Sequence, residues 1–430
     1  MADPAALSPS EREAAYRLNY RLFMWDFIVF TVGMGLLGPS TVIPDFVRGL
    51  TDSEIIIGLS GQLFDICWLL PQLLVARRLL TVAHKKWWFV IPNIPVRLLV
   101  LALSGVIVLV GGEHKTTILA AFLIFYALAG LGDGLVGVPW LDLMGTSIDD
   151  KRRARLFGLG TAVVGVGMIG LNPVVRLILG DQGPDFPNNY ALLFAIAGTL
   201  FVLTVPPTAF IKELPGATPH DVQPAMRDYL PELARVLRAD APFRAAILAR
   251  LLVGLWTMAS PFYIGFATEQ LGMSSSVAVS NLLLMQTLGN VGGSLLLSWL
   301  GERHLLLFIR LLLGMAVLQP LLALLASVTG PVPLYVAFIA SGCIGGSLML
   351  SFMNWVVIYA GHERRPIYSG LLNSLAAVSL LIAPLLGGLI VEGLGYEAVF
   401  AGALMFVIVA LAVCLRWMVS PHRENAVISG

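Results

Sequence analysis

Residues 212–243 read KELPGATPHDVQPAMRDYLPELARVLRADAPF and form the one long hydrophilic stretch in a chain of 430 residues. The stretch lies close to the midpoint, and on either side of it hydrophobic segments alternate with short loops. Hydrophobic residues make up 57% of the chain and charged residues 12%, which leaves too little polar surface to cover a water-soluble fold of this size. The arrangement therefore predicts a membrane protein of two similar halves joined by a linker.

Composition also excludes several classes of protein. The formal net charge is +1 and the basic residues are scattered over short loops, so the sequence shows no basic face for nucleic acid. Neither the three cysteines nor the six histidines have a spacing typical of metal binding or disulfides. The sequence contains no phosphate-binding loop and no catalytic triad. We therefore expect no enzymatic activity, no cofactor and no metal site.

The hydrophobic segments have the length of membrane-spanning helices. Crossing the hydrocarbon core takes about 20 apolar residues in a helix, and the chain has twelve such stretches, six before the linker and six after it. The predicted spans are residues 21–47, 54–76, 87–110, 116–143, 155–179, 190–211, 243–268, 274–300, 304–327, 333–360, 366–391 and 396–418. We predict an all-α integral membrane fold with one six-helix bundle at 1–211, a linker at 212–242 and a second bundle at 243–430.

The lysines and arginines indicate the topology. Most of them fall in the even-numbered gaps, the linker and the termini, whereas the odd-numbered gaps hold only Arg48, Lys115 and Arg176. Short loops rich in Lys and Arg stay on the cytoplasmic side of a membrane. We expect both termini and the linker to be cytoplasmic, in a multi-pass plasma-membrane protein that acts as a monomer. The first twenty residues lack the apolar region of a signal peptide.

The linker has an amphipathic pattern of its own. Apolar residues from Met226 to Leu237 recur at spacings of three and four, opposite charged residues such as Arg227 and Glu232. This pattern predicts a short helix at the membrane interface. It acts either as a surface tether or as a docking site for a partner.

A weak repeat relates the two halves. Trp140 and Trp355 each lie near the linker-side end of the fourth span of their half. A basic loop follows each of them, and then a proline deep in the next span, Pro173 or Pro384. Internal duplication of this kind is common among transporter folds.

Three motifs carry a resemblance to a known family. They are LTDSEIIIGLSG at 50–61, DDKRRARLFG at 149–158 and APLLGGLIVEGLGYEAVF at 383–400. With the arrangement of six plus six helices, they resemble the major facilitator superfamily of secondary transporters over essentially the whole chain. The resemblance implies two pseudo-symmetric six-helix bundles and a central cavity lined by the first and fourth helices of each half.

The chain departs from the family's best-known signature, a Gly-Asp-Arg-Gly type of loop after the second helix. Its place holds PQLLVARRLLTVAHKKWW at 71–88, which keeps basic charge and lacks the aspartate. The basic residues of this loop either gate the transporter or simply set its topology. They are Arg77, Arg78, Lys85 and Lys86.

Charged residues at membrane depth are the strongest site candidates, because an ionisable group in hydrocarbon is costly and is found mainly where it is functional or paired. Counted from the cytoplasmic helix ends, Asp65, Arg97 and Asp133 lie roughly 15 Å deep and Arg250 roughly 12 Å deep. Asp26 and Arg310 lie nearer the surface.

Each candidate has more than one reading. Arg97 pairs with Asp65 or with Asp133, while Asp133 shows no single obvious partner and is a candidate for solute or proton binding. Arg250 either binds an anionic group or pairs with Asp133. The remaining candidates face the cavity, contact the solute or hold helices together by hydrogen bonds; they are Trp140, Trp256, Asn354, Gln286 and Asn290.

The sequence thus predicts a secondary transporter that works by alternating access on a small organic or amphipathic solute. The first candidate for the carboxylate that couples transport to protons is Asp133, and the next candidates are Asp65 and Asp26. The expected partners are the solute, protons and the lipid bilayer. The competing interpretation is a non-transporting protein of the same fold, such as a sensor or an assembly factor or a lipid-handling protein, and a polar cavity would favour transport over it.

Overall fold

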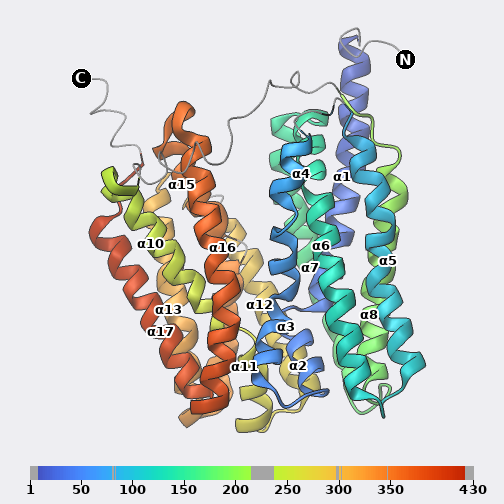
Figure 1. Cartoon of the computed structure of the whole chain (residues 1–430), viewed down its shortest axis with the longest axis vertical. Helices are drawn as coiled ribbons and strands as arrows, with labels where there is room; N and C mark the ends of the chain where they lie inside the picture. The colour runs from blue at the N-terminus through green and yellow to red at the C-terminus, as the bar shows by residue number, and fades with distance from the viewer. Residues whose placement is uncertain are drawn as a thin grey trace. The chain divides into compact units, whose positions relative to one another are not determined.

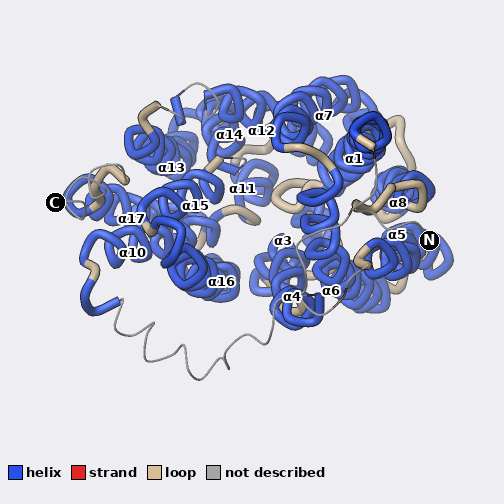
Figure 2. Tube along the Cα trace, turned by 90° about the horizontal axis from the view of Figure 1, so that it is seen from above, coloured by secondary structure: helices blue, strands red, loops and turns tan. Residues whose placement is uncertain are grey.

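The computed structural model describes residues 8–79, 82, 84–214, 237–296, 300, 301, 303–345 and 347–421. Every regular element in these ranges is a helix (Figures 1 and 2). The predicted linker helix falls almost wholly on 215–236, outside the described residues.

The first half of the chain forms eight of these helices. They are α1 (Pro9–Leu37), α2 (Val42–Arg48), α3 (Glu54–Leu69), α4 (Gln72–Leu79), α5 (Lys86–Val110), α6 (Lys115–Ser147), α7 (Asp150–Leu179) and α8 (Asn188–Thr208). The second half contains α10 (Ala241–Leu255), a 3-10 turn η2 (Trp256–Ala259), α11 (Phe262–Gly265), a π turn η3 (Phe266–Gln270), α12 (Ser275–Leu296), α13 (Leu305–Thr329), α14 (Val332–Gly345), α15 (Leu348–Tyr359), α16 (Gly361–Leu394) and α17 (Tyr396–Trp417).

The helices have the length and hydropathy of membrane spans. Within the described part of the chain, nine helical runs are long and apolar enough to cross a membrane. The three other predicted spans coincide with α3 and α4, with α12 and with α16. The chain is therefore an all-helical membrane protein, as the sequence predicts.

Four predicted spans, at 21–47, 54–76, 243–268 and 333–360, are each divided into more than one helical element. The span at 54–76 breaks at Leu70 and Pro71, because proline lacks the N–H that a helix needs and disfavours helical geometry at the preceding residue. The span at 243–268 changes to a 3-10 turn just before Pro261 and to a π turn after Gly265. Membrane bundles tolerate such breaks because neighbouring groups satisfy the freed backbone.

Contacts group the chain into two compact units. Unit 1 comprises residues 1–52 and 62–223, and unit 2 comprises 53–61 and 224–430. In unit 1, α1 packs on α7 and α8, α5 packs on α6 and α8, and α4 packs on α6. In unit 2, α10 packs on α16 and α17, α13 packs on α14 and α17, and α12 packs on α14. The same order of neighbours thus recurs in both units.

Glycines set the closest helix contacts in each unit. A Cβ atom at Gly134 of α6 would lie 2.2 Å from the carbonyl oxygen of Trp68 on α3. In unit 2, a Cβ atom at Gly342 of α14 would lie 1.9 Å from the carbonyl oxygen of Gln286 on α12. Small residues let membrane helices approach this closely. In unit 1 the close approach brings the end of α3 against the face of α6 that carries Asp133.

Candidate functional site

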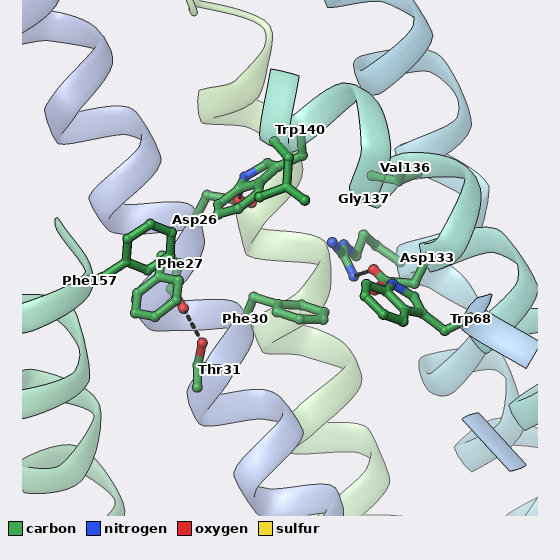
Figure 3. A pocket seen from close by; sticks show the side chains of 12 residues that line it. Asp26, Phe27, Phe30, Thr31, Trp68, Asp133, Val136, Gly137, Trp140 and Phe157 are labelled. Atoms are coloured by element: carbon green, nitrogen blue, oxygen red, sulfur yellow. Dashed lines mark hydrogen bonds and ion pairs between the residues drawn. The ribbon is translucent and has the colours of Figure 1, made fainter. Parts of the chain in front are cut away.

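Unit 1 contains a cavity of about 310 Å³ between α1, α3, α5, α6 and α7 (Figure 3). Most of its wall is apolar, and its polar groups come from residues predicted to lie within the membrane. The lining residues are Asp26, Phe27, Phe30, Thr31, Trp68, Arg97, Asp133, Val136, Gly137, Trp140, Leu141 and Phe157.

An ion pair lies at one side of this cavity. Arg97 Nη1 on α5 donates to Asp133 Oδ1 on α6 at 2.8 Å, and the two residues are only 6% and 8% exposed. The Arg97 guanidinium also lies over the Phe30 ring, 4.2 Å from its centroid. The indole of Trp68 lies beside the Asp133 carboxylate (Figure 3). The pair is thus buried and supported by aromatic side chains on two sides.

Helix periodicity explains why Arg97 points inward. On α5 the buried positions Asn93, Arg97, Val100 and Ser104 follow one another at spacings of three and four, so they form one face of the helix. Because α5 packs along α6, this face brings the guanidinium to Asp133.

Asp26 is the second carboxylate of the cavity. It is 4% exposed, and its Oδ2 accepts a hydrogen bond from Trp140 Nε1 at 2.7 Å. Its Oδ1 is buried and has no hydrogen-bond partner among the residues that the structure describes. Two carboxylates therefore share the cavity with the single guanidinium of Arg97.

The structure distinguishes between the predicted partners of Arg97. The guanidinium pairs with Asp133, and Asp65 is exposed on α3 and lies outside the cavity lining. Asp133, for which the sequence shows no single obvious partner, has one in Arg97, because the packing of α5 on α6 places Arg97 directly against it.

Unit 2 places the remaining candidates outside this cavity. Arg250 is half-buried on α10 and forms no hydrogen bond or ion pair with any described residue. Trp256 is 8% exposed, and its indole N–H has no partner in the described ranges. Asn290 and Asn354 are exposed and Gln286 is half-buried; the backbone of α12 at Gln286 and Asn290 lies against Gly342 of α14.

The basic loop after α4 is attached to other parts of unit 1. Lys85 Nζ pairs with Asp142 at 2.6 Å, and the backbone N–H of Lys85 donates to Glu213 Oε1 at 2.6 Å. The N–H of Lys86 reaches Glu213 Oε2 at 3.4 Å. Arg78 is exposed, and the Arg77 side chain lies outside the described part of the structure. The Lys85 side chain thus has a structural contact with Asp142, and gating by the basic residues stays a prediction.

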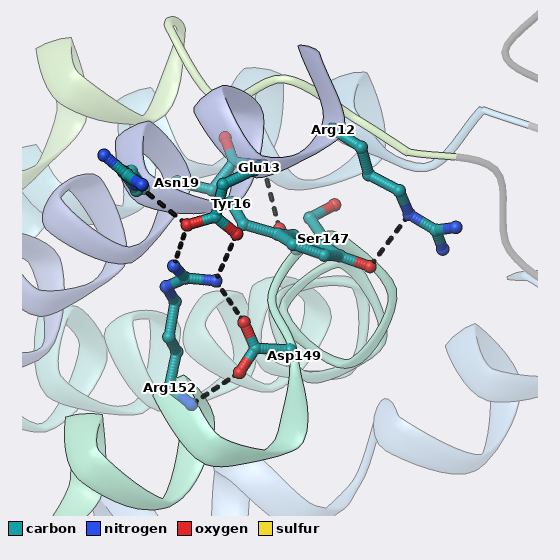
Figure 4. A network of polar contacts seen from close by, with 8 residues as sticks. Arg12, Glu13, Tyr16, Asn19, Ser147, Asp149 and Arg152 are labelled. Carbon is teal, nitrogen blue, oxygen red and sulfur yellow. Dashed lines mark hydrogen bonds and ion pairs between the residues drawn. The ribbon is translucent and has the colours of Figure 1, made fainter. Parts of the chain in front are cut away.

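A polar network joins the start of α1 to the turn between α6 and α7 (Figure 4). Arg152 pairs with both Glu13 and Asp149, and Asp149 also caps α7 by accepting from the Arg152 backbone N–H at 2.8 Å. Asn19 donates to the carbonyl oxygens of Ser147 and Lys212 at 3.0 and 2.8 Å. Partial burial raises the pKa of Asp149, but the hydrogen bonds from Arg152 outweigh it and hold this pKa below its ordinary value.

Sequence reasoning missed most of the apolar wall of the cavity. On α1, Phe30 follows Asp26 by four residues and Thr31 follows Phe27 by four residues, which is a spacing that places side chains on one face of a helix. That pattern was available in the sequence. Trp68 and Phe157 carried no such signal, because their inclusion depends on how α3 and α7 pack.

Comparisons with known proteins agree on one family. The family model of the Major Facilitator Superfamily matches residues 27–379 and 247–429. The chain is 26% identical over 176 residues to an uncharacterized MFS-type transporter, C18.02, of Schizosaccharomyces pombe; the match covers 40% of this chain and 38% of that relative's length.

Solved structures show the same fold. The nucleoside transporter NupG, solved as a mutant, superposes with a TM-score of 0.68 at 14% identity, covering 93% of this chain and 98% of NupG. A bacterial homologue of the iron transporter ferroportin superposes with a TM-score of 0.66 at 14% identity, covering 96% of this chain and 99% of the homologue. A bacterial homologue of the human lysosomal transporter Spinster superposes with a TM-score of 0.62 at 13% identity, covering 95% of this chain and 97% of the homologue. At these identities the likeness concerns the fold alone.

Proposed function

The chain belongs to the major facilitator superfamily of membrane transporters, and on that premise we propose that it moves a small organic or amphipathic solute by alternating access, coupled to protons. The cavity of unit 1 is the proposed binding site. In this cycle the two bundles expose the site first to one side of the membrane and then to the other.

One observation carries the proposal: a buried ion pair, Arg97 with Asp133, lines a cavity that also holds Asp26. Charges within a membrane protein are costly, and they are found mainly on pathways for solutes, ions or protons. A largely apolar cavity with a few convergent polar groups is the usual form of a small-molecule site. These polar groups favour transport over a non-transporting role.

The geometry supports a proton-coupled cycle on this site. When Asp133 takes up a proton, its attraction to Arg97 loses the ionic component, so the two protonation states of the cavity differ in how firmly α5 and α6 are held together. A proton then shifts the equilibrium between the two open forms by the difference in its affinity for them. The solute acts in the same way, and coupling follows because both bind in one cavity.

Transport in proteoliposomes tests the proposal. With an imposed pH gradient and a panel of organic solutes, we expect solute-dependent proton flux with the unaltered protein, and a loss of about ten-fold or more with Asp133→Asn. Asp181→Asn is the matched control, because Asp181 is an exposed aspartate in the turn after α7. Flux and pH dependence that stay unchanged in Asp133→Asn would refute the coupling role of Asp133.

A further inference from the structure

We propose that the solute is an organic cation, an ammonium group attached to an aromatic or similarly flat apolar body, and that Asp26 holds its charge. This inference rests on the proposed function, because it names the substrate class of the same cavity.

The charge balance of the cavity is the first argument. Among its lining residues, Asp26 and Asp133 carry negative charge and Arg97 is the single positive one. Arg97 is already paired with Asp133 at 2.8 Å. An ionised Asp26 therefore leaves one negative charge without a counterion, and a buried charge without a counterion is unfavourable. A cation entering the cavity supplies the missing charge.

The unused hydrogen-bonding capacity of Asp26 is the second argument. Its Oδ2 accepts one hydrogen bond from the Trp140 indole at 2.7 Å, and its Oδ1 has no partner within the described ranges. A carboxylate accepts several hydrogen bonds, and those with charged donors are the strongest. Trp140 is half-buried and lies against the carboxylate (Figure 3), so a rotation of this side chain opens Asp26 to an ammonium group.

The aromatic wall is the third argument. Five aromatic side chains line the cavity: Phe27, Phe30, Trp68, Trp140 and Phe157. Phe27 and Phe157 meet edge to face with centroids 5.5 Å apart. Aromatic faces attract cations, and quaternary ammonium ligands are typically held in aromatic cages. This wall already binds one cation, since the Arg97 guanidinium lies 4.2 Å from the Phe30 centroid.

The same lining disfavours other solutes. An anion would add a third negative charge beside Asp26 and Asp133. A sugar or nucleoside needs several hydrogen-bond partners, whereas Thr31 Oγ1 already donates to the Phe27 carbonyl at 2.6 Å and the Trp140 N–H is occupied by Asp26. The cavity volume of about 310 Å³ is at the lower end of the range of about 300–1,000 Å³ for small-molecule pockets, which fits one small aromatic compound that carries an ammonium group.

Binding to the purified full chain, measured by isothermal titration calorimetry, tests the proposal with three probes that share a naphthyl ring. One carries a trimethylammonium group, one a neutral hydroxymethyl group and one a carboxylate. We expect the cation to bind about ten-fold or more tightly than the alcohol, and the carboxylate to bind most weakly. In Asp26→Asn the cation should lose about ten-fold in affinity, while the alcohol changes by less than about two-fold. Asp181→Asn should leave all three affinities unchanged.

The outcomes separate this proposal from the proposed function. Equal affinities of the three probes for the unaltered protein, or tightest binding of the carboxylate, would overturn the cation proposal even if Asp26→Asn failed to fold. Cation binding that survives Asp26→Asn in folded protein would overturn the role of Asp26. If no probe binds, yet proteoliposomes show proton flux driven by neutral or anionic solutes, the cation proposal fails and the transport function stands. The absence of flux with every solute, the cation included, would instead contradict the proposed function.

Discussion

The two units repeat the same order of helix neighbours but differ in the charges that they bury. The first helix of unit 1, α1, carries Asp26 within its predicted span, whereas its counterpart in unit 2, α10, carries Arg250. The third long helix of each unit carries an arginine, Arg97 on α5 and Arg310 on α13. Arg97 faces a carboxylate in a cavity, and the predicted spans of unit 2 contain no aspartate or glutamate at that depth.

The difference shows which features a duplicated fold keeps and which it loses. Helix packing recurs because small residues let equivalent helices of both bundles approach closely, as Gly134 and Gly342 do. Buried charges recur only where each unit uses them. Removing one partner of a buried pair leaves an uncompensated charge, whereas removing a lone cation leaves none. Equivalent substitutions in the two units should therefore have different effects on stability.

The largest effect is expected at Arg97. Arg97→Leu leaves the Asp133 carboxylate buried without its partner, and we expect a loss of about 3–5 kcal/mol in the free energy of unfolding. Thermal unfolding of the purified protein in detergent measures it. We also expect solute transport to fall by about ten-fold or more, because the same pair lines the cavity.

The double variant Arg97→Leu with Asp133→Leu is the control for this prediction. It removes both charges, so most of the lost stability should return while transport stays low. A double variant that is no more stable than Arg97→Leu would show that the pair is not the cause of the loss.

The second-largest effect is expected at Asp240, at the linker end of unit 2. In unit 2 Asp240 caps α10 and accepts hydrogen bonds from Tyr359 and Tyr368 at 2.8 and 2.9 Å. Asp240→Ala removes a cap and the two hydrogen bonds that Tyr359 and Tyr368 donate to this carboxylate, so we expect a loss of about 2–3 kcal/mol in the free energy of unfolding. Asp240→Asn, which still accepts hydrogen bonds, should lose less. If Asp240→Ala and Asp240→Asn lost equal amounts of stability, the hydrogen bonds accepted by Asp240 would not be the cause of the loss.

A small effect is expected at Arg250, the arginine of α10 that lies deeper in the predicted span than Arg244. Arg250→Gln removes a half-buried charge that has no partner in the described part of unit 2, so the free energy of unfolding should change by less than about 1 kcal/mol and in the stabilising direction. Thermal unfolding of Arg250→Gln and Arg97→Leu, measured under the same conditions, compares the two changes in stability directly. A loss as large as that of Arg97→Leu would reveal a counterion that the described residues do not include, and would remove the difference between the units.

The sequence was sufficient for the fold and for three of the four charged residues that are buried within the described ranges. It also proposed Asp65, which is exposed, and it did not single out the buried Asp45. Hydropathy located the helices, because crossing a membrane requires long apolar runs. It also singled out Asp26, Arg97 and Asp133, because charged residues are rare in such runs. It could not choose between Asp65 and Asp133 as the partner of Arg97, since that depends on the rotation of α3 and α6 about their axes. Side-chain depth alone does not determine this rotation.

The sequence predicted only part of the cavity wall, because some of the lining residues depend on how the helices pack. Asp26 and Phe30 share one face of a single helix, and period alone reveals such a face. Trp68 joins the cavity because Gly134 lets α3 approach α6, and Phe157 joins it from α7. A contact between helices depends on packing that one sequence, read segment by segment, does not contain.

The smallest effect is expected at the linker end of unit 1, where Asp149 meets Arg152 at a partly exposed site. The pKa of Asp149 is below its ordinary value in the folded protein, so its contribution to stability is complete above the unfolded pKa of about 3.9 and is lost as the pH falls through the folded value. Between pH 5 and 8 we therefore expect Asp149→Asn to destabilise by a constant amount of less than about 1 kcal/mol, because asparagine still caps α7 and an exposed pair contributes little. Thermal unfolding across this range measures it. A difference that grows between pH 5 and 8 would mean that another titrating group, rather than the Asp149 carboxylate, controls this end of the unit.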